Sequence, residues 1–174
     1  MGFPILTAPV SPPPSLRADA APKAPETTRY VYPADVVATR EPTLFSTILG
    51  SCVAVCLWDR RRGWGGMSHH LLPNGPADGE RAARFGNVAV EQLIADVTSL
   101  GSDHRDLVAK VFGGARVLRA FSGPNALLGD RNAEAALRAL ADRRIPVAAR
   151  HTGGRRGRKL RFSTTSGTVL LVEL

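Results

Sequence analysis

The chain has 174 residues, of which 44% are hydrophobic and 22% charged, with a formal net charge of +8. This length suits a single domain, and the composition is that of an ordinary globular protein, not of a disordered or fibrous chain. No run of 18 apolar residues is present, so the sequence predicts no transmembrane helix and no membrane insertion.

The N-terminal segment differs in composition from the rest. Residues 1–28 contain seven of the 13 prolines and show no apolar period. Because proline removes a backbone donor and blocks helix formation, this segment is predicted to be a disordered Pro/Ala-rich tail, followed by a folded domain over 29–174. The N-terminus lacks the basic and apolar regions of a secretory signal, so a cytoplasmic location is expected.

The remaining pattern predicts an α/β fold, an α+β-like layered sandwich with a mixed β-sheet and helices packed on it. The predicted strands cover residues 31–37, 44–47, 53–58, 66–72, 107–112, 145–149, 160–164 and 168–173. Residues 53–58 are apolar throughout, which is typical of a strand buried on both faces. Helices are predicted over 81–100, 115–121 and 132–143, the last with Asp130 or Asn132 as its cap.

Two cysteines, Cys52 and Cys56, lie at the beginning of and within this apolar strand. On one strand they are about 13 Å apart, beyond the ~7 Å that a disulfide allows, so both are predicted to be free thiols. Cys52 follows Gly50 and Ser51. A glycine there lets the backbone approach a substrate, and exposed N–H groups at such a turn can bind an oxyanion. Cys52 is therefore the candidate nucleophile.

Two adjacent histidines, His69 and His70, follow seventeen residues later. A strand, a turn and a returning strand can bring an imidazole beside Cys52, where it would favour the thiolate at neutral pH. Neighbouring residues on a strand point to opposite faces, so only one of the two histidines can face Cys52. These residue types alone leave a core cysteine and a structural histidine open as alternatives.

Positive charge is concentrated near the C-terminus. Residues 143–161 carry eight Lys and Arg residues and no acid, and the rest of the chain has 15 basic and 15 acidic residues. Such a segment indicates an acidic partner surface or a nucleic acid. Because only 6% of the residues are aromatic and no nucleic-acid-binding motif is recognisable, no nucleic-acid partner is expected.

Six short motifs follow one another along the chain. They are Leu-Gly-Ser-Cys-Val-Ala-Val-Cys (49–56), Gly-Met-Ser-His-His-Leu-Leu-Pro (66–73), Arg-Phe-Gly-Asn (84–87), Val-Phe-Gly-Gly-Ala (111–115), Gly-Asp-Arg-Asn (129–132) and Thr-Gly-Gly-Arg-Arg-Gly-Arg (152–158). In this order they resemble the CheD family of chemoreceptor glutamine deamidases, and the resemblance covers residues 30–174.

The resemblance implies a catalytic triad of Cys, His and Thr. The cysteine falls on Cys52 and the histidine on His69. The threonine, six residues before the cysteine, falls on Ser46, with Thr47 next to it, so either hydroxyl is a candidate for orienting the imidazole. Further candidates for binding substrate or the oxyanion are Gly50, Ser51, Thr152, Gly153 and Gly154. A plain surface turn at 152–154 is the alternative.

The function that the resemblance implies is that of a cysteine-dependent amidohydrolase in chemotaxis. It would convert glutamine side chains of methyl-accepting chemotaxis receptors, in their cytoplasmic helical region, to glutamate through a thioester. The resemblance also suggests methylesterase activity on glutamyl methyl esters and a CheC-type phosphatase as a partner. This chemistry requires no metal or organic cofactor.

Two other interpretations compete with this one. A metal site built from Cys52, Cys56, His69 and His70 lacks zinc-finger spacing, and its histidines should diverge on a strand. A catalytically weak adaptor would only bind chemoreceptors or a CheC-type phosphatase, and the intact Cys52 and His69 argue against it.

Overall fold

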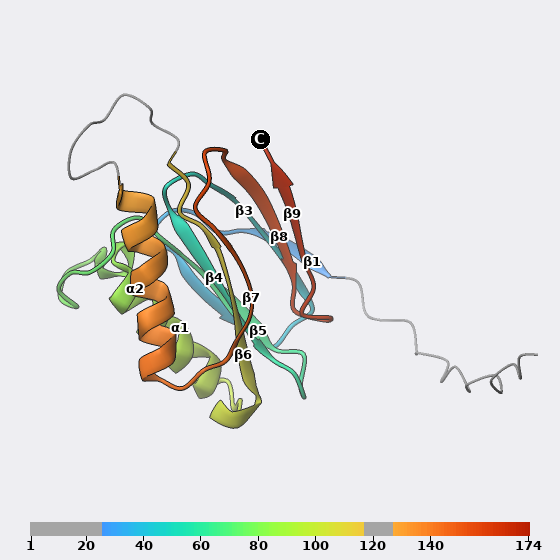
Figure 1. Cartoon of the computed structure of the whole chain (residues 1–174). Coiled ribbons are helices and arrows are strands. Elements are labelled where there is room, and N and C mark those ends of the chain that lie inside the picture. Colours follow the sequence, from blue (N-terminus) through green and yellow to red (C-terminus); the bar gives the residue numbers. More distant parts are fainter. Residues whose placement is uncertain (1–25, 117–126) are drawn as a thin grey trace, which may run out of the picture.

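The computed structural model describes residues 26–116 and 127–174, which form three layers (Figure 1). Helices α1 (Gly86–Ser99) and α2 (Leu128–Asp142) cover one face of a five-stranded sheet, and the other face of this sheet packs on a four-stranded sheet. The predicted α/β layered sandwich is confirmed, with two sheets in place of the single sheet expected.

The five-stranded sheet runs in the order β2 (Val36–Thr39), β5 (Gly65–His70), β4 (Val53–Asp59), β6 (Leu107–Gly113) and β7 (Val147–Thr152). The four-stranded sheet runs in the order β1 (Thr27–Tyr30), β3 (Thr43–Leu49), β8 (Arg158–Ser163) and β9 (Val169–Glu173). Because β4 is antiparallel to both β5 and β6, the loop before β4 lies where β5 and β6 end.

Strand β4 is buried on both faces, as its continuous apolar sequence predicts. Val53, Val55 and Leu57 face the helices, while Ala54 and Cys56 face the four-stranded sheet. Two apolar cores therefore meet at this strand, one on each side. A segment held from both sides is a rigid support for the loop that precedes it, which contains Cys52.

The predicted strand over 31–37 is wrong. Residues 33 and 34 form a turn between β1 and β2, and Ala34 takes a positive φ of 71°. Proline fixes its own φ and removes a ladder donor, so Pro33 favours this break in an otherwise apolar segment. The turn brings residues 31–35 back over the end of β5.

Helix α2 begins earlier than predicted, at Leu128, and its N-cap residue Leu127 makes no side-chain cap. Neither Asp130 nor Asn132 is therefore the cap. Asn132 lies inside the helix and is completely buried. The helix predicted over 81–100 is found as a short 3₁₀ turn (Ala82–Arg84) followed by α1.

Some predictions fall on residues that the structure does not describe. The helix predicted over 115–121 lies largely outside the described residues. Strand β1 begins at Thr27, just inside the predicted tail, while the tail itself stays a prediction because residues 1–25 are not described. Within the described ranges, no helix is long and apolar enough to cross a membrane.

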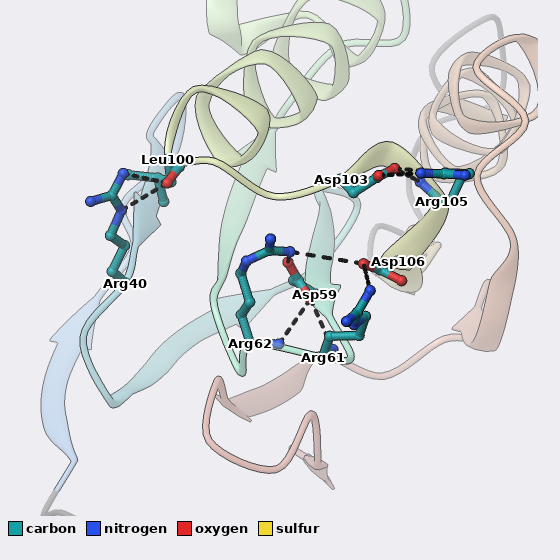
Figure 2. Close-up of polar contacts among 8 residues, drawn as sticks. All are labelled: Arg40, Asp59, Arg61, Arg62, Leu100, Asp103, Arg105 and Asp106. Carbon is teal, nitrogen blue, oxygen red and sulfur yellow. Dashed lines mark hydrogen bonds and ion pairs between the residues drawn. The ribbon is translucent and has the colours of Figure 1, made fainter.

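The turn between β4 and β5 is braced by charge at the opposite end of β4 from Cys52 (Figure 2). The buried Asp59 carboxylate accepts hydrogen bonds from the N–H groups of Arg61 (2.8 Å) and Arg62 (3.0 Å). The Arg62 guanidinium also ion-pairs with Asp59 at 3.3 Å and with Asp106 at 3.8 Å. The brace holds the turn that joins β4 to β5, the two strands whose register pairs Ala54 with His69.

Candidate active site

His69 lies at the end of β5, buried between the two sheets. Its backbone N–H donates to the Asp35 carbonyl (3.0 Å), and its carbonyl accepts from the Ala34 N–H (2.7 Å). The side chain is 2% exposed. The turn after β1 therefore holds the histidine backbone in place, a contact between segments that are distant in the sequence.

A hydrogen-bond chain fixes the protonation of the His69 ring. The Thr47 hydroxyl lies 2.8 Å from the Val31 carbonyl and 3.0 Å from His69 Nδ1. A carbonyl only accepts, so the hydroxyl donates its single hydrogen to Val31 and must accept from Nδ1. Nδ1 also lies 3.4 Å from the Val31 carbonyl, which again requires an N–H. The neutral ring therefore carries its hydrogen on Nδ1 and leaves the Nε2 lone pair free.

Thr47, and not Ser46, contacts the imidazole. Strand β3 alternates between a buried face with Phe45, Thr47 and Leu49 and an outer face with Ser46 and Ile48. Side chains alternate along a strand, so Ser46 points away from His69. Ser46, six residues before Cys52, is therefore the sequence neighbour of Thr47, whose hydroxyl contacts the histidine.

Cys52 lies in the loop between β3 and β4, partly buried against the core between the sheets. In the β4–β5 register, Ala54 pairs with His69 and Val53 with His70. Alternation then puts Cys52 and His69 on the same face as diagonal neighbours, about 7–8 Å apart in backbone position and within reach of a long side chain. The thiol makes no hydrogen bond to Nε2, which has no partner among the described residues.

Burial acts on both members of this pair. It raises the pKa of the Cys52 thiol, partly offset by the residue's own N–H, which lies against the sulfur. It also lowers the pKa of His69, partly offset by the Val31 carbonyl and the Asp35 carboxylate. Both shifts favour the neutral forms. The resting thiolate expected from the sequence is therefore not favoured, because burial penalises the separated charges.

His70 faces the helices and is not placed to act on Cys52. Its Nε2 lies 3.1 Å from the Asn132 carbonyl, and burial lowers the pKa of His70 to about 4. The two histidines therefore diverge, which argues against a metal site shared by both. Among the described residues, no three His, Cys, Asp or Glu side chains are grouped to hold a metal ion.

The glycine pair after β6 packs directly on the cysteine loop. Gly113 has a φ of +114°, and a Cβ there would lie 2.2 Å from the Cys52 carbonyl oxygen. The N–H of Gly114 donates to that same carbonyl at 2.8 Å. This close approach explains why a residue without a side chain is needed at this point.

The predicted substrate residues Thr152, Gly153 and Gly154 lie beside the same strand end. Gly153 N–H donates to the Gly113 carbonyl (3.0 Å), and the Gly154 carbonyl accepts from the Arg116 N–H (2.8 Å). The buried Arg158 guanidinium bridges the two segments through the carbonyls of Gly113 and Gly153. The turn at 152–154 is thus anchored next to the backbone that carries the cysteine loop.

Not all of the basic residues at 143–161 are exposed and unpaired. Arg143 is ion-paired with Glu91 at 2.5 Å, and Arg158 is 2% exposed. Arg150 on β7 and Arg161 on β8 are exposed but belong to different sheets. An acidic partner surface for this segment stays a prediction.

Two features were missed by sequence reasoning. One is the segment at 31–35, which hydrogen-bonds to His69 and Thr47 and is not indicated by any local motif. The other is Asn132, which was interpreted as a cap. Its spacing from Ala136 and Leu140, both buried on α2, is the helical signal that places it on the inner face.

The family model that matches the chain and two of its relatives carry the same family name. The family described as "CheD chemotactic sensory transduction" matches residues 71–173. The chain is 48% identical to "Probable chemoreceptor glutamine deamidase CheD 1" of Anaeromyxobacter dehalogenans, over 83% of this chain and 84% of the relative. It is 43% identical to "Probable chemoreceptor glutamine deamidase CheD" of Trichlorobacter lovleyi, over 82% of this chain and 88% of the relative.

Among solved structures, the chain is similar to the crystal structure of Bacillus licheniformis hypothetical protein YfiH. The TM-score is 0.43 and the sequence identity 14%, over 69% of this chain and 49% of that chain.

Proposed function

The chain belongs to the CheD family, and on that premise we propose that it is a cysteine-dependent deamidase that converts glutamine side chains of chemoreceptors to glutamate. The observation that carries the proposal is the state of His69. Its Nδ1–H is bound by Thr47 and Val31, and its Nε2, on the face shared with Cys52, has no partner within residues 26–116 and 127–174. An imidazole in this state is prepared to accept a proton.

The first half of the reaction forms a thioester. The Cys52 sulfur attacks the carboxamide carbon while His69 Nε2 accepts the thiol proton. Because both groups start neutral, proton transfer accompanies the formation of the S–C bond. The carbonyl oxygen becomes an oxyanion beside the Cys52 N–H. The C–N bond then breaks as the imidazolium gives its proton to the leaving nitrogen, and ammonia departs.

The second half returns the enzyme. His69 Nε2 accepts a proton from a water molecule, whose oxygen attacks the thioester carbon. The tetrahedral species collapses, the C–S bond breaks, and the sulfur recovers its proton from the imidazolium. Thr47 keeps the ring oriented through both halves, because its hydroxyl accepts from Nδ1–H in the neutral and the protonated forms alike.

The same atoms suit a glutamyl methyl ester. The sulfur attacks the ester carbon, the imidazolium protonates the departing methoxide, and the same thioester results. Receptor methylesterase activity is therefore part of the proposal. The proposed target lies in the cytoplasmic helical region of the receptors, so a cytoplasmic location of the protein is part of the proposal. A CheC-type phosphatase is a proposed partner, and co-purification tests it.

The test is peptide mass mapping of a chemoreceptor cytoplasmic fragment after incubation with the protein. We expect a gain of about one mass unit per modified glutamine, lost in Cys52→Ala. Cys56→Ala is the matched control, because Cys56 is buried in the core and is expected to leave conversion intact. Receptor that binds without mass change would contradict the proposal and favour the adaptor interpretation.

A further inference from the structure

Three successive carbonyl groups of the cysteine loop, those of Gly50, Ser51 and Cys52, all accept hydrogen bonds. The Gly50 carbonyl accepts from the Ala115 N–H at 2.7 Å, and the Cys52 carbonyl accepts from the Gly114 N–H at 2.8 Å. Between them, the Ser51 carbonyl accepts from Asn132 Nδ2 at 2.9 Å. Two donors are backbone groups after β6, and the third is a side chain of α2.

The direction of these carbonyls sets the direction of the N–H groups. A trans peptide is planar, and its C=O and N–H point in opposite directions. The Ser51 carbonyl shares its peptide plane with the Cys52 N–H. A donor that binds this carbonyl from the side of α2 therefore turns the Cys52 N–H away from α2. The Cys52 N–H belongs to the same residue as the sulfur and lowers the pKa of its thiol, so it is available beside the carbonyl that the sulfur would attack.

We propose that Asn132 is a positioning residue that aims the Cys52 N–H at the oxyanion formed during deamidation, an inference that rests on the proposed function. Its amide group also polarises the peptide that it binds, because a hydrogen bond to a carbonyl strengthens the N–H on the other side of the same peptide. Asn132 acts through the backbone and does not touch the substrate.

Asn132 joins the two halves of the site. Its Nδ2 also donates to the Leu71 carbonyl at 2.8 Å, just after His69 and His70, so both hydrogens of the side-chain amide are used. Its backbone carbonyl accepts from His70 Nε2 at 3.1 Å. One buried residue thus fixes the peptide before the nucleophile and the strand end that carries the base.

The two contacts of Asn132 Nδ2 depend on its residue type, while Oδ1 is buried without a hydrogen-bond partner among the described residues. A carboxylate of the same shape would set one oxygen atom, in the place of Nδ2, against the carbonyls of both Ser51 and Leu71. An aliphatic side chain would leave both carbonyls without this donor in a buried site. Asn87 offers a matched comparison outside the cysteine loop. Its Nδ2 donates to the Gly75 carbonyl and its Oδ1 accepts from the Gly75 N–H, both at 3.0 Å.

The experiment compares Asn132→Asp with Asn87→Asp in the full-length protein, using a receptor fragment as substrate. Deamidation is measured as kcat and KM. The rate of Cys52 alkylation by iodoacetamide is measured at high pH, where the thiol is fully ionised and the rate no longer changes with pH. Alkylation proceeds by displacement at a saturated carbon and forms no oxyanion, so it reports on the thiol and the access to it without the oxyanion donor.

We expect Asn132→Asp to lower kcat about 10- to 100-fold, because removing one oxyanion donor outright lowers kcat about 100- to 1000-fold and here the donor is only misdirected. KM and the plateau rate of alkylation should stay within about twofold of the wild type. Asn87→Asp is expected to keep kcat. Asn132→Ser, too short to reach both carbonyls, is expected to lose kcat in the same way and replaces the aspartate variant if that one fails to fold.

An unchanged kcat in the Asn132 variants would overturn the inference. So would a parallel fall of kcat and alkylation, which would mean that the whole site collapses. A wild-type protein that deamidates no receptor would instead refute the proposed function itself, so the two failures are distinguishable.

Discussion

Replacing Thr47 with valine removes one hydroxyl and keeps the shape of the side chain. The hydroxyl holds two buried partners, the Val31 carbonyl at 2.8 Å and His69 Nδ1 at 3.0 Å. Two neutral hydrogen bonds at about 0.5–1.5 kcal/mol each give about 1–3 kcal/mol. Because Nδ1 keeps its longer contact with Val31 at 3.4 Å, we expect the lower part of this range, about 1–2 kcal/mol of stability.

The same energy orients the imidazole during catalysis. At 1.36 kcal/mol per factor of ten, a loss of about 1–2 kcal/mol lowers kcat/KM about 5- to 30-fold. The assay is deamidation of a receptor fragment, with denaturant unfolding measured in parallel. Ser46→Ala is the matched control, because Ser46 lies on the outer face of β3, and it should change kcat/KM less than about twofold. A larger loss in Ser46→Ala than in Thr47→Val would refute the reasoning.

Three more predictions follow from the site. Burial lowers the pKa of His69, so the imidazole stays neutral at a lower pH than an ordinary histidine. As the pH is lowered, kcat/KM should therefore begin to fall only below the ordinary histidine pKa of about 6.5. A fall in kcat/KM on acidification that begins above about pH 7 would contradict this. Burial raises the pKa of the Cys52 thiol, so the rate of its labelling by iodoacetamide should keep rising with pH above the ordinary cysteine pKa of about 8.5. Labelling is followed by peptide mass mapping, and the buried Cys56 should stay unlabelled. A labelling rate of Cys52 that already reaches its maximum near neutral pH would instead indicate a thiolate. Gly113→Ala adds a Cβ 2.2 Å from the Cys52 carbonyl oxygen, whereas the Cβ of Gly79→Ala, at a similarly positive φ, meets nothing within 4 Å. Gly113→Ala should therefore lower both Tm and kcat much more than Gly79→Ala does. Equal effects of the two variants would show that the close approach at Gly113 is unimportant.

The strands of the core were predictable because their patterns are local. The continuous apolar run at 53–58 predicted a strand buried on both faces, and β4 has that environment. The division into two sheets was not predictable. It depends on β3 pairing with β8, and that pairing joins residues more than a hundred positions apart. Single-sequence periodicity carries no information on such a pairing.

The site shows the same limit in finer detail. Strand alternation allowed only one of the two histidines to face Cys52, and the register selects His69. The family resemblance left Ser46 and Thr47 both open as the third hydroxyl. The buried face of β3 is set by Phe45 and Leu49, and Thr47 shares their alternation. That alternation was readable in advance. The turn at 31–35 that binds the His69 backbone was not, because it arises from tertiary contacts alone.

The central claim is that a covalent thioester on Cys52 precedes glutamate. Hydroxylamine tests it directly, because this nucleophile competes with water for a thioester and does not react with an unactivated glutamine amide. Mass mapping of a receptor fragment incubated with the protein and hydroxylamine should find glutamyl hydroxamate at the glutamines that otherwise become glutamate, and neither product with Cys52→Ala. Glutamate that forms without hydroxamate at any hydroxylamine concentration, or that persists in Cys52→Ala, would contradict the account.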